Sequence, residues 1–178
     1  MTYLKIILIG MKGCGKSTVG KLLAEKLNIQ FIELDDELEK EHFQAKKKKL
    51  NFREIYRKYG QEYFRKLESS VLKGLVKRAD NNNYILACGG GTPLNLINQK
   101  ILKQLGKVIY LKPDRDALYK RIISGGIPAF FANPNNPISS FNAVLKYRNP
   151  VYEKLADITL KCKTMDPEQI VKMIQLQI

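Results

Sequence analysis

Residues 10–17 constrain the fold more than any other segment, because they fit the pattern G-x-x-x-x-G-K-[ST] throughout. They follow an apolar, β-branched run over 3–9, which is typical of a strand buried on both faces, and they precede a helical apolar stripe over 16–28. Glycines allow backbone N–H groups to face a phosphate, and the following helix directs its positive end at the same anion. In this setting Lys16 can reach the β- and γ-phosphates, and the Ser17 hydroxyl can ligate Mg²⁺. The segment therefore predicts a strand–loop–helix unit that binds a nucleoside triphosphate.

Strand patterns alternate with helical patterns along the whole chain of 178 residues. We predict strands over 3–9, 31–34, 84–88, 107–111 and 157–160. Helices are expected over 16–28, 36–42, 52–59, 61–78, 114–122 and 140–154, with two more opened by Thr92-Pro93 and Asp166-Pro167. Strands separated by helices form βαβ units. We therefore expect an α/β, single-domain P-loop NTPase fold: a five-stranded parallel sheet with helices on both faces and a mobile loop over 124–137.

The charge balance is strongly basic, with 31 Lys and Arg against 17 Asp and Glu and a formal net charge of +14. Such a surface suits a nucleic acid or a small anionic ligand, and it can also be a solvated surface without a partner. The densest run, Lys46 to Lys49, lacks the interleaved aromatic residues of a single-strand binding site, which favours a solvated surface. The apolar run over 6–9 is too short to span a membrane. We expect a soluble cytoplasmic protein with no nucleic-acid or membrane partner.

The cysteines and the single histidine are expected to be structural. Cys14, Cys88 and Cys162 show neither a pairing pattern nor the spacing of a zinc site. Cys14 lies inside the phosphate-binding loop, where it is either a small filler residue or a thiol that makes the loop sensitive to oxidation. His42 stands among charged residues, so we expect it at the surface and outside any catalytic site.

A phosphate-binding loop occurs in kinases, GTPases, motor ATPases and helicases. The length excludes most motors, and guanine-reading motifs such as N-K-x-D are absent. The strands at 84–88 and 107–111 do not end in the aspartate that usually makes a second Mg²⁺ contact. The available acids are Glu33, Asp35 and Asp36, at the end of the second strand and therefore at the edge that carries the phosphate loop. A carboxylate there could hold Mg²⁺ or orient an acceptor hydroxyl, whereas Asp36 also suits a helix N-terminus.

Four motifs and a late segment resemble the shikimate kinase family, which has the nucleoside-monophosphate-kinase type of P-loop fold. The first motif is 10–17 followed by Thr18, and the second, F-I-E-L-D at 31–35, resembles the family's D-x-D. The third, G-Q-E-Y-F-R-K-L-E at 60–68, resembles G-E-x-x-F-R-x-x-E, and the fourth is the glycine triplet at 89–91. Late in the chain, Arg148, Pro150 and Tyr152 resemble the end of Y-x-x-R-x-P-x-Y. The motifs follow in order across nearly the whole chain, which makes the joint pattern more specific than any one of them.

The resemblance implies ATP-dependent phosphorylation of the 3-hydroxyl group of shikimate, on the chorismate route to the aromatic amino acids. It implies one kinase domain over 1–178, with a lid over about 113–137 and a substrate-binding region over about 33–65. It places in the ATP site Gly13, Cys14, Gly15, Lys16, Ser17, Thr18 and Arg121. It places in the shikimate site Asp35, Arg65, Gly89, Gly90, Gly91 and Arg148. Mg²⁺ would be held by Ser17 and Glu33, and the expected catalytic residues are Lys16, Asp35 and Arg121.

The implied roles make chemical sense. Arg65 and Arg148 would clamp the shikimate carboxylate, a task that suits the fork of a guanidinium group. Asp35 would orient or deprotonate the attacking hydroxyl. The glycine triplet would let backbone N–H groups approach the substrate, and Glu68 would hold Arg65 in position. Taken alone, Arg65 and Glu68 could be a helix-surface ion pair, and the triplet could be only a strand-to-helix loop.

Two positions depart from the family pattern. Glu33 stands where the family usually has aspartate on the Mg²⁺ side. The lid usually contains Arg-Pro-Leu, but residues 125–129 read G-G-I-P-A, so Ile127 replaces an arginine that approaches the phosphates and shikimate. Either turnover is lower or another cation substitutes, because such an arginine contributes strongly to the rate. Lys12, Lys120 and Arg121 are the candidates, and we expect Arg121, which resembles the family's arginine at the base of the lid.

Two kinds of rival function remain. One is another small-molecule kinase on the same scaffold, such as a gluconate kinase or a nucleoside-monophosphate kinase. Arg65, Arg148 and the glycine triplet favour a compact carboxylate acceptor over a nucleotide. The other rival is a nucleic-acid-binding protein that retains a phosphate loop, which only the net charge supports. We expect a monomer that binds ATP and shikimate.

Overall fold

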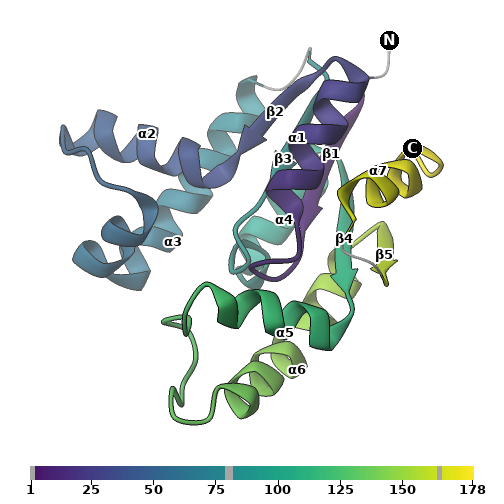
Figure 1. Ribbon diagram of the computed structural model, residues 1–178. Helices are drawn as coiled ribbons and strands as arrows, with labels where there is room; N and C mark the ends of the chain where they lie inside the picture. The colour runs from purple at the N-terminus through teal and green to yellow at the C-terminus, as the bar shows by residue number, and fades with distance from the viewer. Residues whose placement is uncertain (1–2, 79–81, 164–165) are drawn as a thin grey trace.

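The computed structural model describes residues 3–78, 82–163 and 166–178 (Figure 1). Within them, five parallel strands form one sheet in the order β2-β3-β1-β4-β5. The strands are β1 (Lys5–Ile9), β2 (Gln30–Glu33), β3 (Tyr84–Ala87), β4 (Lys107–Pro113) and β5 (Ile158–Cys162). Every predicted strand is present, and the α/β P-loop fold with a five-stranded parallel sheet is confirmed.

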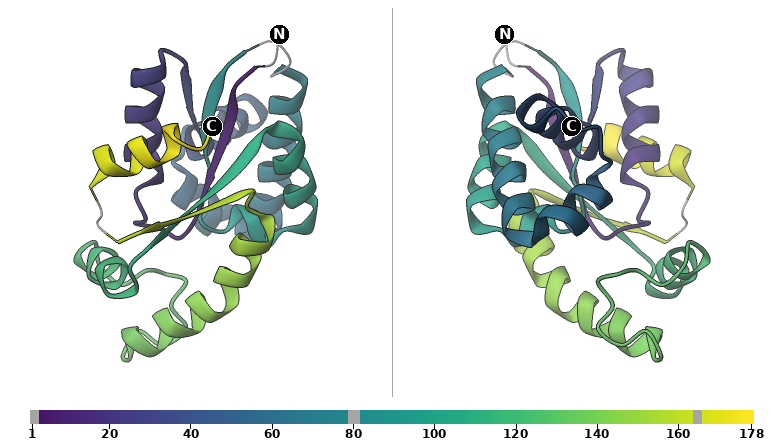
Figure 2. Two further views of the ribbon diagram at one scale, coloured as in Figure 1. Left: turned by 90° about the vertical axis from the view of Figure 1, so that its right-hand side faces the viewer. Right: turned by 90° about the vertical axis from the view of Figure 1, so that its left-hand side faces the viewer.

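Helices cover both faces of this sheet. They are α1 (Lys16–Leu27), α2 (Leu34–Lys46), α3 (Phe52–Arg78), α4 (Leu96–Leu105), α5 (Arg115–Ser124), α6 (Pro137–Leu155) and α7 (Pro167–Gln175). Figure 2 shows α1 and α7 on one side of the sheet and α3 with α4 on the other. Helices α5 and α6 lie beyond the lower edge of the sheet as drawn in Figure 1, where β1 ends. The carboxyl edge of the sheet therefore faces the segment that the sequence predicted to be a lid.

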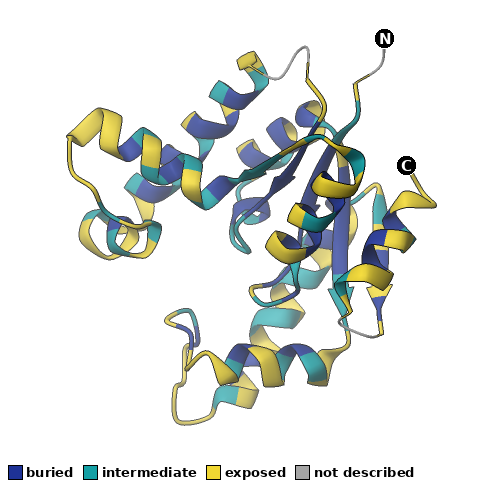
Figure 3. Cartoon of the chain, turned by 45° about the horizontal axis from the view of Figure 1, so that its top comes forward, coloured by how far each residue is buried: buried dark blue, intermediate teal, exposed yellow. Residues whose placement is uncertain are grey.

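The core lies between these layers. Ile6, Ile7, Leu8 and Ile9 of the central strand are fully buried, and so are the residues of β3, so that the buried colour in Figure 3 follows the strands. A parallel sheet that is covered on both faces needs apolar side chains on both, which explains the unbroken apolar run in the sequence. None of the helices in the described residues is long and apolar enough to cross a membrane.

Two helix predictions differ in detail from the structure. The helices expected over 52–59 and 61–78 form one element, α3, interrupted at Gly60, where φ is 80° and ψ is 173°. The helix expected to open at Thr92-Pro93 begins instead at Leu96, after a short 3₁₀ turn over Thr92–Leu94, and its N-cap is Asn95. The start signal was misread because the Thr92 hydroxyl donates to a buried carboxylate and does not cap the helix.

The lysine run lies at the end of α2. Lys46 is the last residue of that helix, and Lys47 adopts a left-handed conformation (φ 55°) that ends it. The side chains from Lys46 to Lys49 are exposed. The run therefore lies at an exposed helix end.

Candidate active site

The phosphate loop joins β1 to α1 at the carboxyl edge of the sheet. Gly15, the N-cap of α1, has φ 96°, a left-handed conformation that a side chain would strain. Lys16 is buried, and its Nζ donates to the carbonyl oxygens of Gly10 at 3.0 Å and Met11 at 2.9 Å. The free N–H groups of the first turn of α1 and this ammonium group together form a positive cradle suited to a phosphate.

Two acidic side chains lie next to this loop. Glu33 ends β2 and Asp35 lies in the first turn of α2. The Ser17 hydroxyl donates a hydrogen bond to Glu33; burial raises the pKa of Glu33, an effect that Ser17 and Lys16 oppose. Burial, followed by the negative charge of Glu33, raises the pKa of Asp35 to about 7. A carboxyl group with a pKa near neutrality is suited to accept a proton from a hydroxyl group.

The glycine triplet follows β3 and contacts functional side chains closely. A methyl group built on Gly89 would lie 3.5 Å from Oδ1 of Asp35, and one built on Gly91 would lie 2.5 Å from Nη2 of Arg65. A side chain at position 91 would push the Arg65 guanidinium group out of place, whereas one at position 89 would be in van der Waals contact with the Asp35 carboxylate and would crowd the Thr92 hydroxyl, 3.1 Å away. The triplet therefore does more than connect a strand to a helix: its backbone lies against both groups.

Gly90 connects the triplet to the phosphate loop and to α6. A methyl group on it would lie 3.2 Å from the backbone nitrogen of Lys12 and 3.6 Å from Nη1 of Arg148. Its carbonyl oxygen accepts hydrogen bonds from the Tyr152 hydroxyl at 2.5 Å and from Nη1 of Arg148 at 3.5 Å. Gly90 therefore contacts both the phosphate loop and two side chains of α6, Arg148 and Tyr152.

Arg65 is held by a buried network. It forms an ion pair with Glu68, whose side chain is 2% exposed. The Thr92 hydroxyl donates to the other carboxylate oxygen of Glu68 at 2.7 Å, and the Asn98 amide donates to the Thr92 carbonyl at 3.2 Å. Because Glu68 is satisfied from both sides, it fixes the direction of the guanidinium group.

The segment expected to be a lid, about 113–137, contains α5 and the loop over 125–136, and α6 follows it. Arg121 of α5 packs against the phosphate loop, since its Cγ would lie 3.8 Å from a methyl group on Gly13. In the middle of the loop, the centre of the Phe130 ring lies 4.8 Å from the guanidinium carbon of Arg148. Ile127, between them, is half exposed.

This geometry agrees with the comparisons to known proteins. The family model "Shikimate kinase" matches residues 12–178. The chain belongs to the shikimate kinase family. A shikimate kinase from Sulfurihydrogenibium sp. (strain YO3AOP1) is 31% identical over 97% of this chain and 96% of its own length. One from Alkaliphilus oremlandii (strain OhILAs) is 34% identical over 95% of each chain.

Solved structures of shikimate kinases have the same architecture. The enzyme from Acinetobacter baumannii, solved in complex with shikimate, is 31% identical, covers 98% of this chain and 93% of its own, and has a TM-score of 0.83. The enzyme from Aquifex aeolicus is 32% identical over 97% of this chain and 94% of its own, with a TM-score of 0.76.

The site residues expected for a shikimate kinase fall into one region of this structure. The phosphate loop with Glu33 and Asp35, the glycine triplet, and Arg148 are joined by the contacts above, and Arg65 reaches the same place from α3. Sequence reasoning did not find Thr92 or the role of Tyr152 in holding Gly90. The late motif that ends at Tyr152 could have indicated its role. Thr92 precedes Pro93, a pattern typical of a helix start, and this misleading pattern concealed its hydrogen bond to Glu68.

The surface position expected for His42 is wrong. Its side chain is fully buried between α2 and α3, where Nδ1 lies 2.8 Å from the Tyr63 hydroxyl and the ring packs edge-on against Tyr59. The sequence contained the signal: His42 is four residues after Leu38, itself four after Leu34, so that all three share one face of the helix. The charged neighbours concealed that spacing.

Proposed function

We propose that this protein transfers the γ-phosphoryl group of ATP to the 3-hydroxyl group of shikimate, giving shikimate 3-phosphate and ADP in aromatic amino acid biosynthesis. One observation carries the proposal: a carboxylate and two guanidinium groups surround the glycine triplet directly beside a phosphate loop. A phosphate loop alone fits any nucleotide enzyme. The additional groups match a small acceptor that has both hydroxyl groups and a carboxylate.

Arg65 and Arg148 are the proposed ligands of the shikimate carboxylate. They come from α3 and α6 and approach the triplet from different sides, at Gly91 and Gly90. Two guanidinium groups can bind a carboxylate through charged, paired hydrogen bonds, which an uncharged sugar or an adenine ring would leave unused. This arrangement favours a compact carboxylate acceptor over a nucleotide.

Asp35 is the proposed acceptor of the hydroxyl proton. In the reaction, the 3-oxygen of shikimate forms a bond to the γ-phosphorus, the bond from that phosphorus to the bridging oxygen of ADP breaks, and the hydroxyl proton passes to Asp35. Lys16, the loop N–H groups and Arg121 would stabilise the charge on the phosphates. Gly13, Cys14, Gly15, Ser17 and Thr18 would contact the phosphates as parts of the same loop.

Ser17 and Glu33 fit a Mg²⁺ ion that accompanies ATP. Their hydroxyl and carboxylate groups are already in hydrogen-bond contact. Both are oxygen ligands of the kind Mg²⁺ prefers, and few protein ligands are needed because water and phosphates complete its shell. The Mg²⁺ would neutralise the phosphate charge when bound. Glu33 in place of aspartate retains the charge on a longer side chain.

The test is ADP release from MgATP by the purified protein, with shikimate, gluconate, AMP or no acceptor added. Stimulation by shikimate alone is the expected result. Stimulation by gluconate or AMP would assign one of the rival kinase functions. No stimulation by any acceptor, with ATP still bound, would refute the proposed function and indicate a degenerate kinase or a binding protein. An Arg148→Ala variant should raise the KM for shikimate while leaving ATP binding intact, and intact shikimate affinity would show that the carboxylate clamp is misassigned.

The expected absence of a nucleic-acid partner is tested separately. Oligonucleotide binding that persists at about 0.15 M salt would reveal a nucleic-acid partner, because purely electrostatic binding weakens steeply with salt. The monomeric state and the cytoplasmic location remain predictions from the sequence.

A further inference from the structure

The middle of the expected lid carries no charged side chain. Residues 122–145, which contain the loop between α5 and α6, include no lysine, arginine, histidine, aspartate or glutamate, although the chain has 31 Lys and Arg. In phosphoryl transfer, negative charge spreads over the oxygens of the moving group, and cations placed there accelerate the reaction. If the lid closes, it brings apolar and amide side chains to this group. The positive charge must therefore come from residues outside this segment.

Most cations near the site already have partners. Arg65 is paired with the buried Glu68. Arg148 donates to the Gly90 carbonyl and lies over the ring of Phe130. These two guanidinium groups also belong to the proposed carboxylate clamp, so they are not available to the moving phosphoryl group.

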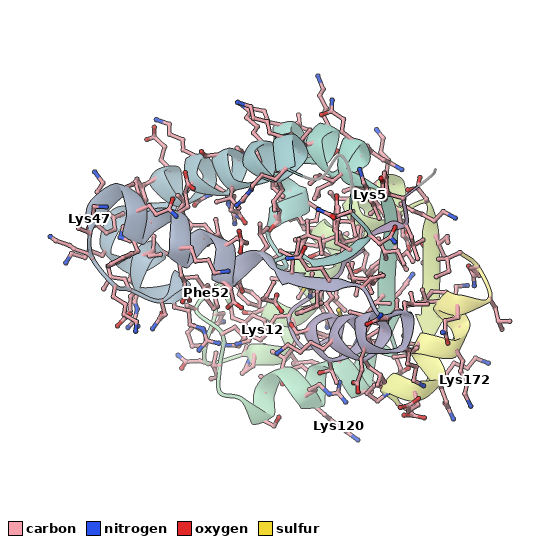
Figure 4. The ribbon with its side chains drawn as sticks, turned by 90° about the horizontal axis from the view of Figure 1, so that it is seen from above. Lys5, Lys12, Lys47, Phe52, Lys120 and Lys172 are labelled. Carbon is pink, nitrogen blue, oxygen red and sulfur yellow. The ribbon has the colours of Figure 1, made fainter. Side chains whose placement is uncertain are left out.

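The two candidates at the base of the lid have other surroundings. Arg121 packs beside Gly13 of the phosphate loop, where its expected role is to bind the phosphates of the donor. Lys120 points outward from α5 at the edge of the molecule in Figure 4, away from the sheet. We therefore do not assign the missing charge to either of them.

Lys12 has the position that the others lack. It is the third residue of the phosphate loop, and its backbone nitrogen would lie 3.2 Å from a methyl group on Gly90. It therefore stands where the loop that binds the donor touches the loop that lies against Asp35. Its side chain is exposed, Figure 4 shows it in the middle of the molecule between α2 and the lid, and it has no ion-pair partner among the described residues. A four-carbon stem allows its ammonium group to reach over a bound phosphate.

We propose that Lys12 is a catalytic residue whose ammonium group stabilises the transferring phosphoryl group from the phosphate loop, in place of an arginine from the lid. The inference rests on the proposed kinase function. The Lys12 ammonium group would act between donor and acceptor. Its loss should therefore affect the transition state more than the binding of either substrate.

The first test compares Lys12→Met, which keeps the stem and removes the charge, with Lys120→Met as a matched exposed control. For Lys12→Met we expect kcat to fall at least 10-fold, with the KM for ATP changed less than threefold and the thermal midpoint unchanged. Lys120→Met should keep wild-type kcat. A Lys12→Met variant within twofold of wild-type kcat, or one that changes only the KM for ATP, overturns the proposal.

The second test asks whether a cation at position 127 in the lid can replace the ammonium group of Lys12. Adding Ile127→Arg to Lys12→Met should recover at least fivefold in kcat, and a double variant no faster than Lys12→Met overturns the equivalence. In the presence of ADP and shikimate, aluminium fluoride mimics the transferring phosphoryl group. The Lys12→Met variant should bind aluminium fluoride with ADP and shikimate at least 10-fold more weakly than the wild type, and it should bind ADP alone with unchanged affinity. If the wild-type protein shows no shikimate-dependent turnover, the proposed function fails first and this inference fails with it.

Discussion

Replacing Asp35 by asparagine should stabilise the fold while it removes activity. The Asp35 carboxyl group is largely buried, and its neighbours include the acidic Glu33, Glu68 and Asp36. Its pKa is raised from 3.8 to about 7 by burial first and by the Glu33 charge second, with only Lys16 opposing among the causes. The folded protein therefore destabilises the charged form of Asp35, and asparagine has nearly the same shape without the charge.

The size of the effect follows from this pKa. At about 1.4 kcal/mol for each pH unit, ionising Asp35 costs the folded protein roughly 4 kcal/mol more than it costs the unfolded chain. Relaxation and water near the site reduce the figure, so we expect Asp35→Asn to gain about 2–4 kcal/mol above pH 7. Because the pKa of Asp35 is higher in the folded state than in the unfolded chain, Asp35 stays protonated to a higher pH in the folded state. The wild-type protein therefore loses stability as the pH rises from about 4 to about 7, and the gain at pH 5 is less than half of the gain at pH 8.

Urea unfolding of both proteins at pH 5, 6, 7 and 8 measures this difference. Asp36→Asn is the matched control, because Asp36 is an exposed neighbour in the same helical turn. It should give a small loss of stability that changes little with pH, since an acid is favourable near a helix N-terminus. If Asp35→Asn gave the same stability change at every pH, or a loss at pH 8, the electrostatic reasoning would be refuted.

Three further predictions concern the same site and its supporting helices. The kcat/KM for shikimate should rise with pH through an apparent pKa near 7, because protonated Asp35 cannot accept the hydroxyl proton; ADP release from pH 5.5 to 8.5 checks this, and a flat profile contradicts it. Glu68→Gln should raise the KM for shikimate about 10-fold without changing that for ATP, because Arg65 loses its fixed partner; steady-state kinetics with both substrates varied would show an unchanged KM if the pair were only structural. His42→Phe should stabilise the protein by up to about 1 kcal/mol, because Nε2 is buried without a hydrogen-bond partner among the described residues, a gain that the lost contact between Nδ1 and the Tyr63 hydroxyl reduces. Burial and then Lys46, Lys48 and Lys58 lower the His42 pKa, so the wild-type protein loses stability below about pH 6.5; the advantage of His42→Phe in urea unfolding should therefore be larger at pH 5.5 than at pH 7.5, and equal values would contradict this.

The sheet could be predicted from the sequence because its signals are local. The run over 6–9 is apolar on both faces, which only a strand covered by helices on both sides requires, and the glycines after it fix where the strand ends. Alternation of strands and helices then implies parallel pairing. The break in α3 at Gly60 was also visible, as a boundary between two expected helices.

The network behind Arg65 could not be predicted in the same way. Thr92 and Asn98 follow β3, whereas Glu68 lies on α3, and no local pattern says that these segments meet. A threonine before a proline has a strong local explanation as a helix cap, and the tertiary hydrogen bond to a buried carboxylate overrides it. His42 was misplaced for a related reason, since charged neighbours dominate the sequence while the spacing from Leu38 decides the packing.

The two halves of the site differ in how far they are satisfied without ligands. On the acceptor side, Glu68 neutralises Arg65 and the Gly90 carbonyl engages Arg148, so both guanidinium groups are fixed before a carboxylate arrives. Beside the phosphate loop, burial raises the pKa values of Glu33 and Asp35, and the charge of Glu33 raises the pKa of Asp35 further. Guanidinium groups that are already held in place add binding precision, whereas the buried Asp35 carboxylate is stabilised further when a cation or a donating hydroxyl group arrives. The free-energy cost of burying the Glu33 and Asp35 carboxylates therefore lies where the phosphoryl group would move.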